Sequence, residues 1–406
     1  MAVPLSQSAV SPTHLLQRGV AEIIVQESLL RKLESGRSLR LKEGFDPSAP
    51  DIHLGHAVGL RKLRQFQELG HTVVLIVGDW TARIGDPTGR SVTRPMLTEE
   101  EVRANAETYL SQFFKIVDRS RTEVVWQSEW YRTFDLADVI RLASKFTVAQ
   151  MLAREDFARR YQEGNPISLT ELLYPLLQAY DSVAVRADVE FGGLDQKFNC
   201  LVGRELQGMV GQEPQDIVLT PLLVGLDGAQ KMSKSLGNYV GIAEPPDTMY
   251  GKIMRLRDEA IVSYLRNLTD IPDAEIDRYQ QAMERGEVNP MEVKMHLAHE
   301  IVAQFHGAAE ARPAEEEFVR VYRRREQPTA APVYHLPPGT TLISPVDLLV
   351  GAGLAKSKSE ARRLIQQGAV ELDGVRIADW RDAVQVWPGA LLRVGPVRRV
   401  RLVVEP

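Results

Sequence analysis

Apolar and polar residues at the start of the chain follow two different periods, one helical and one extended. Apolar positions in 13–34 and in 53–69 recur at helical spacing, so each stretch predicts an amphipathic helix. Residues 38–45 alternate and run into a Gly-Phe-Asp-Pro turn, which predicts a strand. Residues 71–78 form a nearly continuous apolar run, typical of a buried parallel strand. Strand, helix and strand in this order are the pattern of a doubly wound sheet.

The same alternation continues towards residue 240. Further strands are expected at 123–127, 188–193 and 216–224, and further helices at 136–160, 167–185 and 195–206. We therefore expect the α/β class, with a Rossmann-like doubly wound parallel sheet in residues 1–240.

The pattern changes beyond this domain. Residues 241–326 are mostly charged with helical spacing, and they predict a small all-α domain. Residues 327–342 are rich in proline and predict a linker. Residues 343–406 combine two short helices with two strands, which predicts a compact α+β domain.

Composition excludes several classes of protein. Of the 406 residues, 44% are hydrophobic and 25% are charged, which is ordinary for a globular protein and unlike a disordered or fibrous chain. No apolar run approaches the ~18 residues that a membrane helix needs, and the N-terminus lacks the pattern of a signal peptide. The one cysteine, Cys200, permits neither an intramolecular disulfide nor a cysteine metal cluster. We therefore expect a cytoplasmic protein with no membrane partner.

Charge is distributed unevenly along the chain. The net charge is −5, from 49 basic and 54 acidic residues. Residues 343–406 hold ten of the basic and seven of the acidic residues, a net of +3, so the remainder carries 39 and 47, a net of −8. This asymmetry indicates a C-terminal module for a polyanion, although chance variation of a few charges is an equal alternative.

Two histidines mark the first candidate site. His53 and His56 lie three residues apart where the second predicted helix begins, with Gly55 between them. A helix N-terminus presents unpaired N–H groups and partial positive charge, so it binds phosphate readily. Packing histidines are the alternative, but the preceding turn and the neighbouring strands favour a nucleotide-binding crevice.

The second candidate site is the segment Lys-Met-Ser-Lys-Ser, which follows the last predicted strand. Lys231 and Lys234 are three residues apart among small hydroxyl side chains. Such a loop suits closure over phosphates, because lysine is a point charge that follows a moving anion. Taken alone, the segment is equally consistent with a solvated basic loop.

Together these motifs resemble the signatures of class I aminoacyl-tRNA synthetases. Within that class the chain resembles the tyrosyl-tRNA synthetase family, in the bacterial branch that carries DQKFN. The resemblance covers essentially the whole chain. Its motifs are GFDPSAPDIHLGH, IGDPTGR, YPLLQAYD, FGGLDQKFN, KMSKS, NPMEVKMHLAHEIV and, at 350–374, a segment similar to S4 RNA-binding domains.

The resemblance implies a role for individual residues. Around bound tyrosine it places Asp86, Tyr174 and Gln178 at the amino group, Asp181 at the phenol, Gln196 beside the carboxylate and Thr81 close by. At ATP it places Asp46, Ser48, His53, Gly55, His56, Gly193, Asp195, Lys231 and Lys234, with Arg90 and Arg94 assisting at the pyrophosphate. It also implies Mg²⁺ carried by ATP, with no metal held by the protein.

The resemblance further implies RNA binding and assembly. Lys356, Lys358, Arg362 and Arg363 match the RNA-facing side of S4-like domains, although each is singly also consistent with a solvated helix face. L-tyrosine, ATP and tRNA(Tyr) would be the substrates, with 241–326 on the anticodon side and a homodimer as the assembly.

One position departs from the family pattern. Many members carry a tyrosine before the Gly-Phe-Asp-Pro turn, and it contacts the substrate phenol. This chain has Lys42 and Glu43 there. Asp181 is therefore the main specificity determinant that we expect.

Three other functions compete with tyrosylation of tRNA. Tryptophanyl-tRNA synthetase shares the fold and both signatures, but Asp181 and the S4-like segment argue against it. Small-molecule nucleotidyltransferases share the histidine motif, but the helical domain and the RNA-binding segment argue against them. A synthetase-derived RNA-binding protein would show eroded signatures, yet both histidines and both lysines are present.

Overall fold

A computed structural model describes residues 15–47, 51–88, 97–323, 333–337, 339–395 and 398–404. The chain forms two compact units, Met1–Glu316 and Glu317–Pro406. The domain limits expected at residues 240, 326 and 342 stay predictions. Within the described ranges no helix is both long and apolar enough to cross a membrane.

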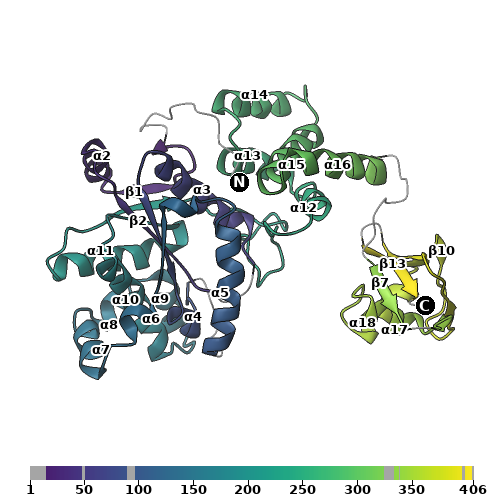
Figure 1. Ribbon diagram of the computed structural model, residues 1–406, viewed down its shortest axis with the longest axis horizontal. Helices are drawn as coiled ribbons and strands as arrows, with labels where there is room; N and C mark the ends of the chain where they lie inside the picture. The colour runs from purple at the N-terminus through teal and green to yellow at the C-terminus, as the bar shows by residue number, and fades with distance from the viewer. Residues whose placement is uncertain are drawn as a thin grey trace. The chain divides into compact units, whose positions relative to one another are not determined.

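The first unit is built on a six-stranded sheet in the order β1-β6-β5-β2-β3-β4. Figure 1 shows the strands of this unit, with β1 and β2 labelled, among its helices. Its strands are β1 Glu22–Ile24, β2 Arg40–Phe45, β3 Thr72–Val77, β4 Thr122–Trp126, β5 Val189–Gly193 and β6 Asp216–Thr220. Every pairing is parallel except that of β1 with β6. The order runs outward in both directions from β2 and β5, which confirms the doubly wound sheet.

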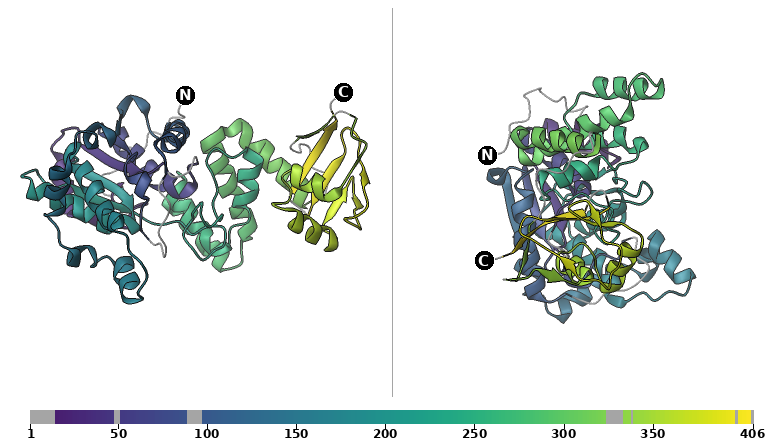
Figure 2. Two further views of the ribbon diagram at one scale, coloured as in Figure 1. Left: turned by 90° about the horizontal axis from the view of Figure 1, so that it is seen from below. Right: turned by 90° about the vertical axis from the view of Figure 1, so that its right-hand side faces the viewer.

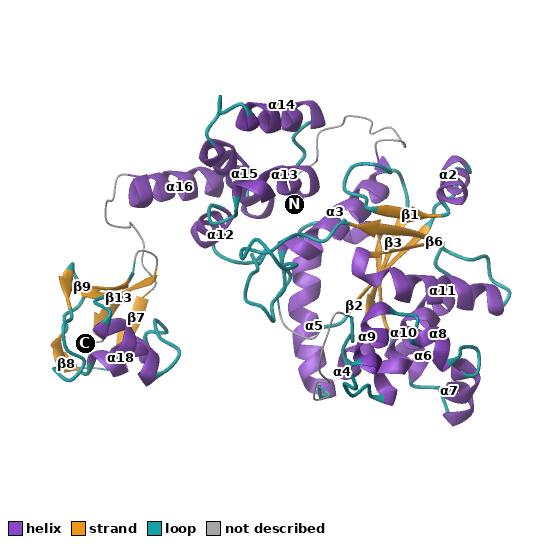
Figure 3. Cartoon of the chain, turned by 180° about the vertical axis from the view of Figure 1, so that it is seen from behind, coloured by secondary structure: helices purple, strands orange, loops and turns teal. Residues whose placement is uncertain are grey.

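Helices cover both faces of this sheet. Figure 3 shows α3 and α5 on one side and α10 and α11 on the other. The helices of this part are α2 Gln26–Glu34, α3 Leu54–Glu68, α4 Thr81–Ile84, α5 Glu99–Phe113, α6 Ser128–Tyr131, α7 Leu136–Ala143, α8 Val148–Met151, α9 Glu155–Gln162, α10 Leu169–Ala184 and α11 Lys197–Met209. Capping boxes begin α5 at Thr98 and α10 at Ser168, so side chains satisfy the first free N–H groups of both helices.

Two helix predictions were wrong in detail. The range 13–34 is not one helix, because Gly19 and Val25 both adopt positive φ and Glu22–Ile24 pairs with β6 instead; residues 13 and 14 lie outside the described ones. The range 136–160 holds three short helices, of which α7 and α8 have their own caps at Asp135 and Thr147.

A helical layer follows the sheet within the first unit. It consists of α12 Pro246–Ile253, α13 Ile261–Leu268, α14 Asp273–Glu284, α15 Pro290–His306 and α16 Ala308–Phe318, which reaches past residue 316. The Arg18 guanidinium donates to the carbonyls of Leu265, Arg266, Thr269 and Ile271, where α13 ends. The Leu265 carbonyl also accepts from the backbone N–H and the hydroxyl of Thr269, so Arg18 adds to the hydrogen bonds that end the helix.

The second unit contains a five-stranded sheet in the order β10-β9-β12-β13-β7 and a two-stranded β8–β11 ribbon. Its elements are β7 Val333–Leu336, β8 Leu342–Ile343, α17 Pro345–Gly351, α18 Lys358–Gln366, β9 Val370–Leu372, β10 Val375–Arg376, β11 Val384–Gln385, β12 Leu391–Val394 and β13 Arg398–Val404. The two helices and the sheet share one buried core (Figure 2). β7 lies inside the expected linker, 327–342. This segment forms a strand because it pairs in parallel with β13.

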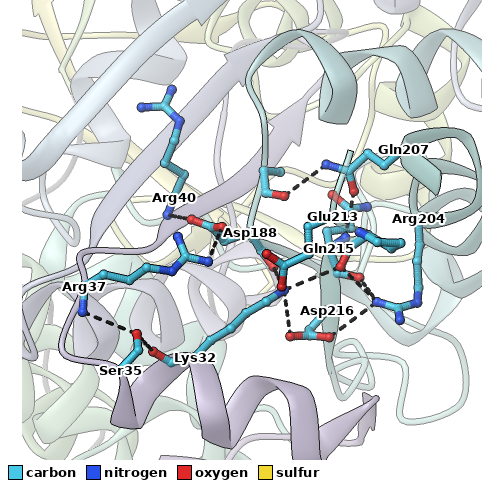
Figure 4. A network of polar contacts seen from close by, with 12 residues as sticks. Lys32, Ser35, Arg37, Arg40, Asp188, Arg204, Gln207, Glu213, Gln215 and Asp216 are labelled. Carbon is cyan, nitrogen blue, oxygen red and sulfur yellow. Dashed lines mark hydrogen bonds and ion pairs between the residues drawn. The ribbon is translucent and has the colours of Figure 1, made fainter. Parts of the chain in front are cut away.

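A buried ionic network ties the amino ends of the strands together (Figure 4). The Lys32 ammonium of α2 lies 3.0 Å from an Asp216 carboxylate oxygen and donates to the carbonyl of Asp188 at 3.1 Å. The Asp188 carboxylate accepts from Arg37 and from the backbone of Arg40, both at 2.8 Å. This network holds β2, β5 and β6 at the edge of the sheet opposite to the candidate site.

Candidate active site

The site is a cavity of about 990 Å³ at the carboxyl ends of the parallel strands. It lies where the strand order reverses between β2 and β5, which is where open α/β sheets bind ligands. The expected site residues of the first unit that the structure describes all line this cavity. They are Asp46, His53, Gly55, His56, Thr81, Asp86, Tyr174, Gln178, Asp181, Gly193, Asp195, Gln196, Lys231 and Lys234.

The two histidines lie side by side at the start of α3, with their ring planes tilted by 33°. Their ring centroids are 3.9 Å apart. The Nδ1 of His53 accepts from the backbone N–H of Gly55 at 3.1 Å, and the Nδ1 of His56 accepts from the backbone N–H of His53 at 3.3 Å. A Cβ at Gly55 would lie 2.9 Å from the His53 ring, so only glycine fits between them.

Both imidazoles are neutral at pH 7. Burial, with Lys234 and Lys231 nearby, lowers the pKa of His53 to about 3. Burial and the neighbouring His53 lower the pKa of His56 well below its usual range. Because each Nδ1 accepts a hydrogen bond, each neutral ring carries its proton on Nε2. The pair therefore offers two N–H donors without positive charge.

The segment 231–235 lies over the cavity and is held from both sides. The Lys231 ammonium lies 2.6 Å from an Asp195 carboxylate oxygen. The Lys234 ammonium lies 2.8 Å from the hydroxyl of Tyr109 on α5. Burial lowers the pKa of Lys234 to about 8. Both cations of the segment thus face the cavity at the level of the histidines.

A chain of short hydrogen bonds forms the wall beside β2. The Asp46 carboxylate accepts from the Thr81 hydroxyl at 2.6 Å and from the Tyr174 hydroxyl at 2.8 Å. On the opposite side, the Gln196 amide donates to Asp86 at 2.7 Å. The wall therefore combines carboxylates and hydroxyls whose positions are fixed before any ligand binds.

Asp181 is the most buried acid of the cavity lining, with 2% of its surface exposed. One carboxylate oxygen accepts from the Gln127 amide at 2.7 Å, and the other has no hydrogen bond within the described part of the chain. Burial raises the pKa of Asp181 to about 7, while Lys42 acts in the opposite direction. A buried acceptor without a partner costs free energy, which a donor from a ligand would recover.

Lys42, at the position of the family tyrosine, does not reach the cavity. Its side chain is fully buried, and its ammonium donates to Glu190 and to the Ser182 hydroxyl, both at 2.7 Å. It also donates to the backbone carbonyl of Gln178 at 3.0 Å. Lys42 therefore supports the helix that carries Gln178 and does not itself face a ligand.

Sequence reasoning missed several polar residues of the lining, among them Glu43, Tyr109 and Gln127. Gln127 directly follows β4, so its place at the carboxyl edge of the sheet was a usable signal. Glu43 is buried, and burial together with Glu190 raises its pKa to about 8. Tyr109 lies on an amphipathic helix, and nothing in its spacing distinguishes it from a core residue.

The remaining expected residues lie either outside the described residues or in the second unit. Ser48, Arg90 and Arg94 lie outside the described residues. Lys356, Lys358, Arg362 and Arg363 are all exposed, on α18 or just before it. Lys358 pairs with Asp347 at 2.8 Å, and the Arg362 guanidinium lies 4.6 Å from the centre of a Trp380 ring.

Comparison with known proteins agrees with this geometry. Residues 34–323 match the family model for class I tRNA synthetases (W and Y), so the fold and the site define a class I aminoacyl-tRNA synthetase. Residues 330–387 match a model for a tyrosine–tRNA ligase SYY-like C-terminal domain. The chain belongs to the tyrosine–tRNA ligase family.

Individual relatives cover nearly the whole chain. It is 59% identical over 394 residues to a tyrosine–tRNA ligase of Dehalococcoides mccartyi, covering 97% of this chain and 99% of that one. It is 53% identical over 388 residues to that of Thermotoga maritima, covering 96% of each. A solved tyrosyl-tRNA synthetase of Archaeoglobus fulgidus, complexed with L-tyrosine, matches with a TM-score of 0.61 at 26% identity, over 74% of this chain and 98% of that one.

The electrostatics of the site predict a one-sided pH profile for the activation step. At tyrosine concentrations that saturate the protein at every pH, so that Asp181 with its pKa of about 7 stays occupied, kcat/KM for ATP is flat from about pH 5.5 to 7.5, because His53 is already neutral there, with a pKa of about 3. It falls above about pH 8 as Lys234 loses its proton. Pyrophosphate exchange measured across this range checks both limbs. An acidic limb centred near pH 6.5 would contradict the neutral histidine pair.

Proposed function

We propose that this chain is a tyrosine–tRNA ligase that works through the cavity between β2 and β5. It joins L-tyrosine to ATP to form tyrosyl-adenylate with release of pyrophosphate, and then transfers tyrosine to the 3′ end of tRNA(Tyr) with release of AMP. The observation that carries the proposal is Asp181, a buried carboxylate with one oxygen that accepts no hydrogen bond from the described residues and can accept one from a phenol. Imidazoles and ammonium groups line the same cavity.

In the first step the tyrosine carboxylate attacks the α-phosphorus of ATP, and the bond from that phosphorus to the pyrophosphate oxygen breaks. No nucleophile is needed from the protein, because both reacting groups belong to substrates. Catalysis comes from positioning and from neutralising charge on the departing phosphates. His53 and His56 donate from Nε2, while Lys231 and Lys234 supply positive charge. Mg²⁺ arrives with ATP, held mainly by the phosphates.

Lys231 changes partner during this step. In the structure its ammonium is paired with Asp195, the carboxylate proposed to bind the ribose. Ribose hydroxyls that donate to Asp195 would compete with this pair and release the ammonium towards the phosphates. Arg90 and Arg94 are proposed to assist there, and Asp46, Ser48, Gly55 and Gly193 to frame the nucleotide.

Tyrosine is proposed to bind along the inner wall. Its ammonium group meets Asp86, Tyr174 and Gln178, its carboxylate lies beside Gln196, and Thr81 closes the wall through its bond to Asp46. The phenol donates to Asp181. Gln127 orients that carboxylate, and its amide oxygen itself accepts from the backbone N–H of Thr81 at 2.9 Å.

The second unit is proposed to bind tRNA. Exposed Lys356, Lys358, Arg362 and Arg363 suit phosphate contacts, which fix position and carry little sequence information. The family membership supports tRNA(Tyr) as the partner and a cytoplasmic location. It also argues against the tryptophan, nucleotidyltransferase and purely RNA-binding alternatives, because the compared relatives are tyrosine–tRNA ligases.

A homodimer is proposed from an apolar face on α7 and α8. Leu136 is 74% exposed, Ile140 59% and Val148 62%, while Leu142 faces the core. Leu136 and Ile140 are four residues apart and share one face of α7. Exposed apolar residues gathered in this way mark an interaction site. The resemblance to the family indicates a second copy of the chain as its occupant.

Replacing Asp181 tests the proposed specificity. Asp181→Asn lowers kcat/KM for tyrosine by about tenfold to a hundredfold, because the phenol then meets a neutral amide instead of a carboxylate and the hydrogen bond loses its charge assistance. Preference for tyrosine over phenylalanine falls by a similar factor, whereas KM for ATP changes little. Pyrophosphate exchange with each amino acid measures both. Asp79→Asn is the matched control, since Asp79 accepts from the Ser128 backbone N–H outside the cavity lining. Unchanged preference in Asp181→Asn would refute the assignment.

Replacing Ile140 tests the dimer. Ile140→Asp places a charge on the apolar face and shifts sedimentation from dimer to monomer at micromolar concentration, with at least about a tenfold weaker association. Leu69→Asp, at an exposed apolar residue beyond α3, leaves the dimer intact. A native protein that sediments as a monomer, or an Ile140→Asp variant that stays dimeric, contradicts this interface.

A further inference from the structure

Tyr109 holds one end of the loop over the site through two contacts of a single side chain. Its hydroxyl lies 2.8 Å from the Lys234 ammonium. The same ammonium lies 4.6 Å from the centre of the Tyr109 ring. The hydroxyl oxygen and the negative face of the ring both attract a cation, so Tyr109 is a double acceptor for Lys234.

The surroundings make Tyr109 a rigid partner. Only 5% of its surface is exposed, and its ring packs against Phe113 at 5.7 Å and against His56 at 6.4 Å between centroids. Burial, with Asp46 and Asp51 nearby, raises the pKa of Tyr109, so the phenol stays neutral. Lys234 instead has a long side chain with many rotamers, and its ordering costs conformational entropy.

The contact between Tyr109 and Lys234 matters because of the way the loop lies over the cavity. Lys231, three residues before Lys234, is paired with Asp195 on the β5 side of the cavity. Between the two lysines, the Cβ of Met232 lies 3.7 Å from where a Cβ would stand on Gly55. The segment therefore crosses the cavity mouth and is held at both ends, by a carboxylate on one side and by Tyr109 on the other.

We propose that Tyr109 is a positioning residue that latches Lys234 over the histidine pair before ATP binds. It acts through the lysine. Because the ammonium is already oriented, less entropy is lost when it moves onto the departing pyrophosphate. The kinetic part of this inference rests on the proposed function, whereas the closed position of the loop does not.

Two variants separate the contributions of Tyr109. Tyr109→Phe removes the hydroxyl and keeps the ring, and Tyr109→Leu removes both. In the full-length protein without substrates, tryptic cleavage after Lys231 or Lys234 becomes about threefold to tenfold faster in Tyr109→Phe and faster still in Tyr109→Leu. Tyr250→Phe, which removes a buried hydroxyl bonded to the Met295 carbonyl, is the control and leaves cleavage unchanged. Equal cleavage rates in all four proteins would overturn the latch.

Kinetics provide the second readout. Tyr109→Phe slows single-turnover adenylate formation by about fivefold to tenfold and leaves the Kd of tyrosine and the thermal midpoint unchanged. In a double-mutant cycle, Tyr109→Phe does not slow the Lys234→Met variant any further, because that variant has no ammonium group for Tyr109 to position. Fully additive effects, or weaker tyrosine binding, would mean that Tyr109 acts elsewhere. If the native protein forms no adenylate, the proposed function fails, and the cleavage assay alone then decides the position of the loop.

Discussion

The site depends on the parallel pairing of β2 with β5, because at this pair the strand order reverses. Leu41 pairs with Val189 and Lys42 with Glu190, whereas on its other edge β2 pairs with β3 along its full length. The chain leaving β2 turns into α3 and brings the histidines, while the chain leaving β5 brings Gly193 and Asp195. Two segments more than a hundred residues apart thus meet across one crevice, and a single ligand can contact both.

Around that crevice, burial determines what each ionisable group can do. The imidazoles are neutral, Asp181 has a raised pKa, and one of its oxygens accepts no hydrogen bond from the described residues. Lys42 and Glu190 form a buried ion pair, and the Lys42 ammonium also donates to the backbone of α10. The positive charge at the cavity therefore comes from the two lysines of the loop, Lys231 and Lys234. The cavity lining therefore combines a buried carboxylate with the cations of the loop, and the proposed binding mode assigns the phenol to the first and the phosphates to the second.

Sequence alone predicted the elements whose signals are local. An apolar run predicted β3, and the turn before His53 predicted the start of α3. Predictions failed where distant partners decide the structure. β1 forms because β6 offers an edge, and β7 forms because β13 does, although a proline-rich stretch lies beside it. For the site, motif residues were predictable by resemblance, whereas Tyr109 has its role only because the Lys234 ammonium folds back onto α5.

The central claim is that this cavity selects tyrosine and activates it with ATP. Its most direct test is exchange of labelled pyrophosphate into ATP, run with the native full-length protein, Mg²⁺ and each of the twenty amino acids, without tRNA. The account predicts exchange with tyrosine and none above background with the others. Exchange with tryptophan would contradict the role of Asp181 while keeping the fold. No exchange with any amino acid would contradict the activation chemistry itself and favour an RNA-binding role.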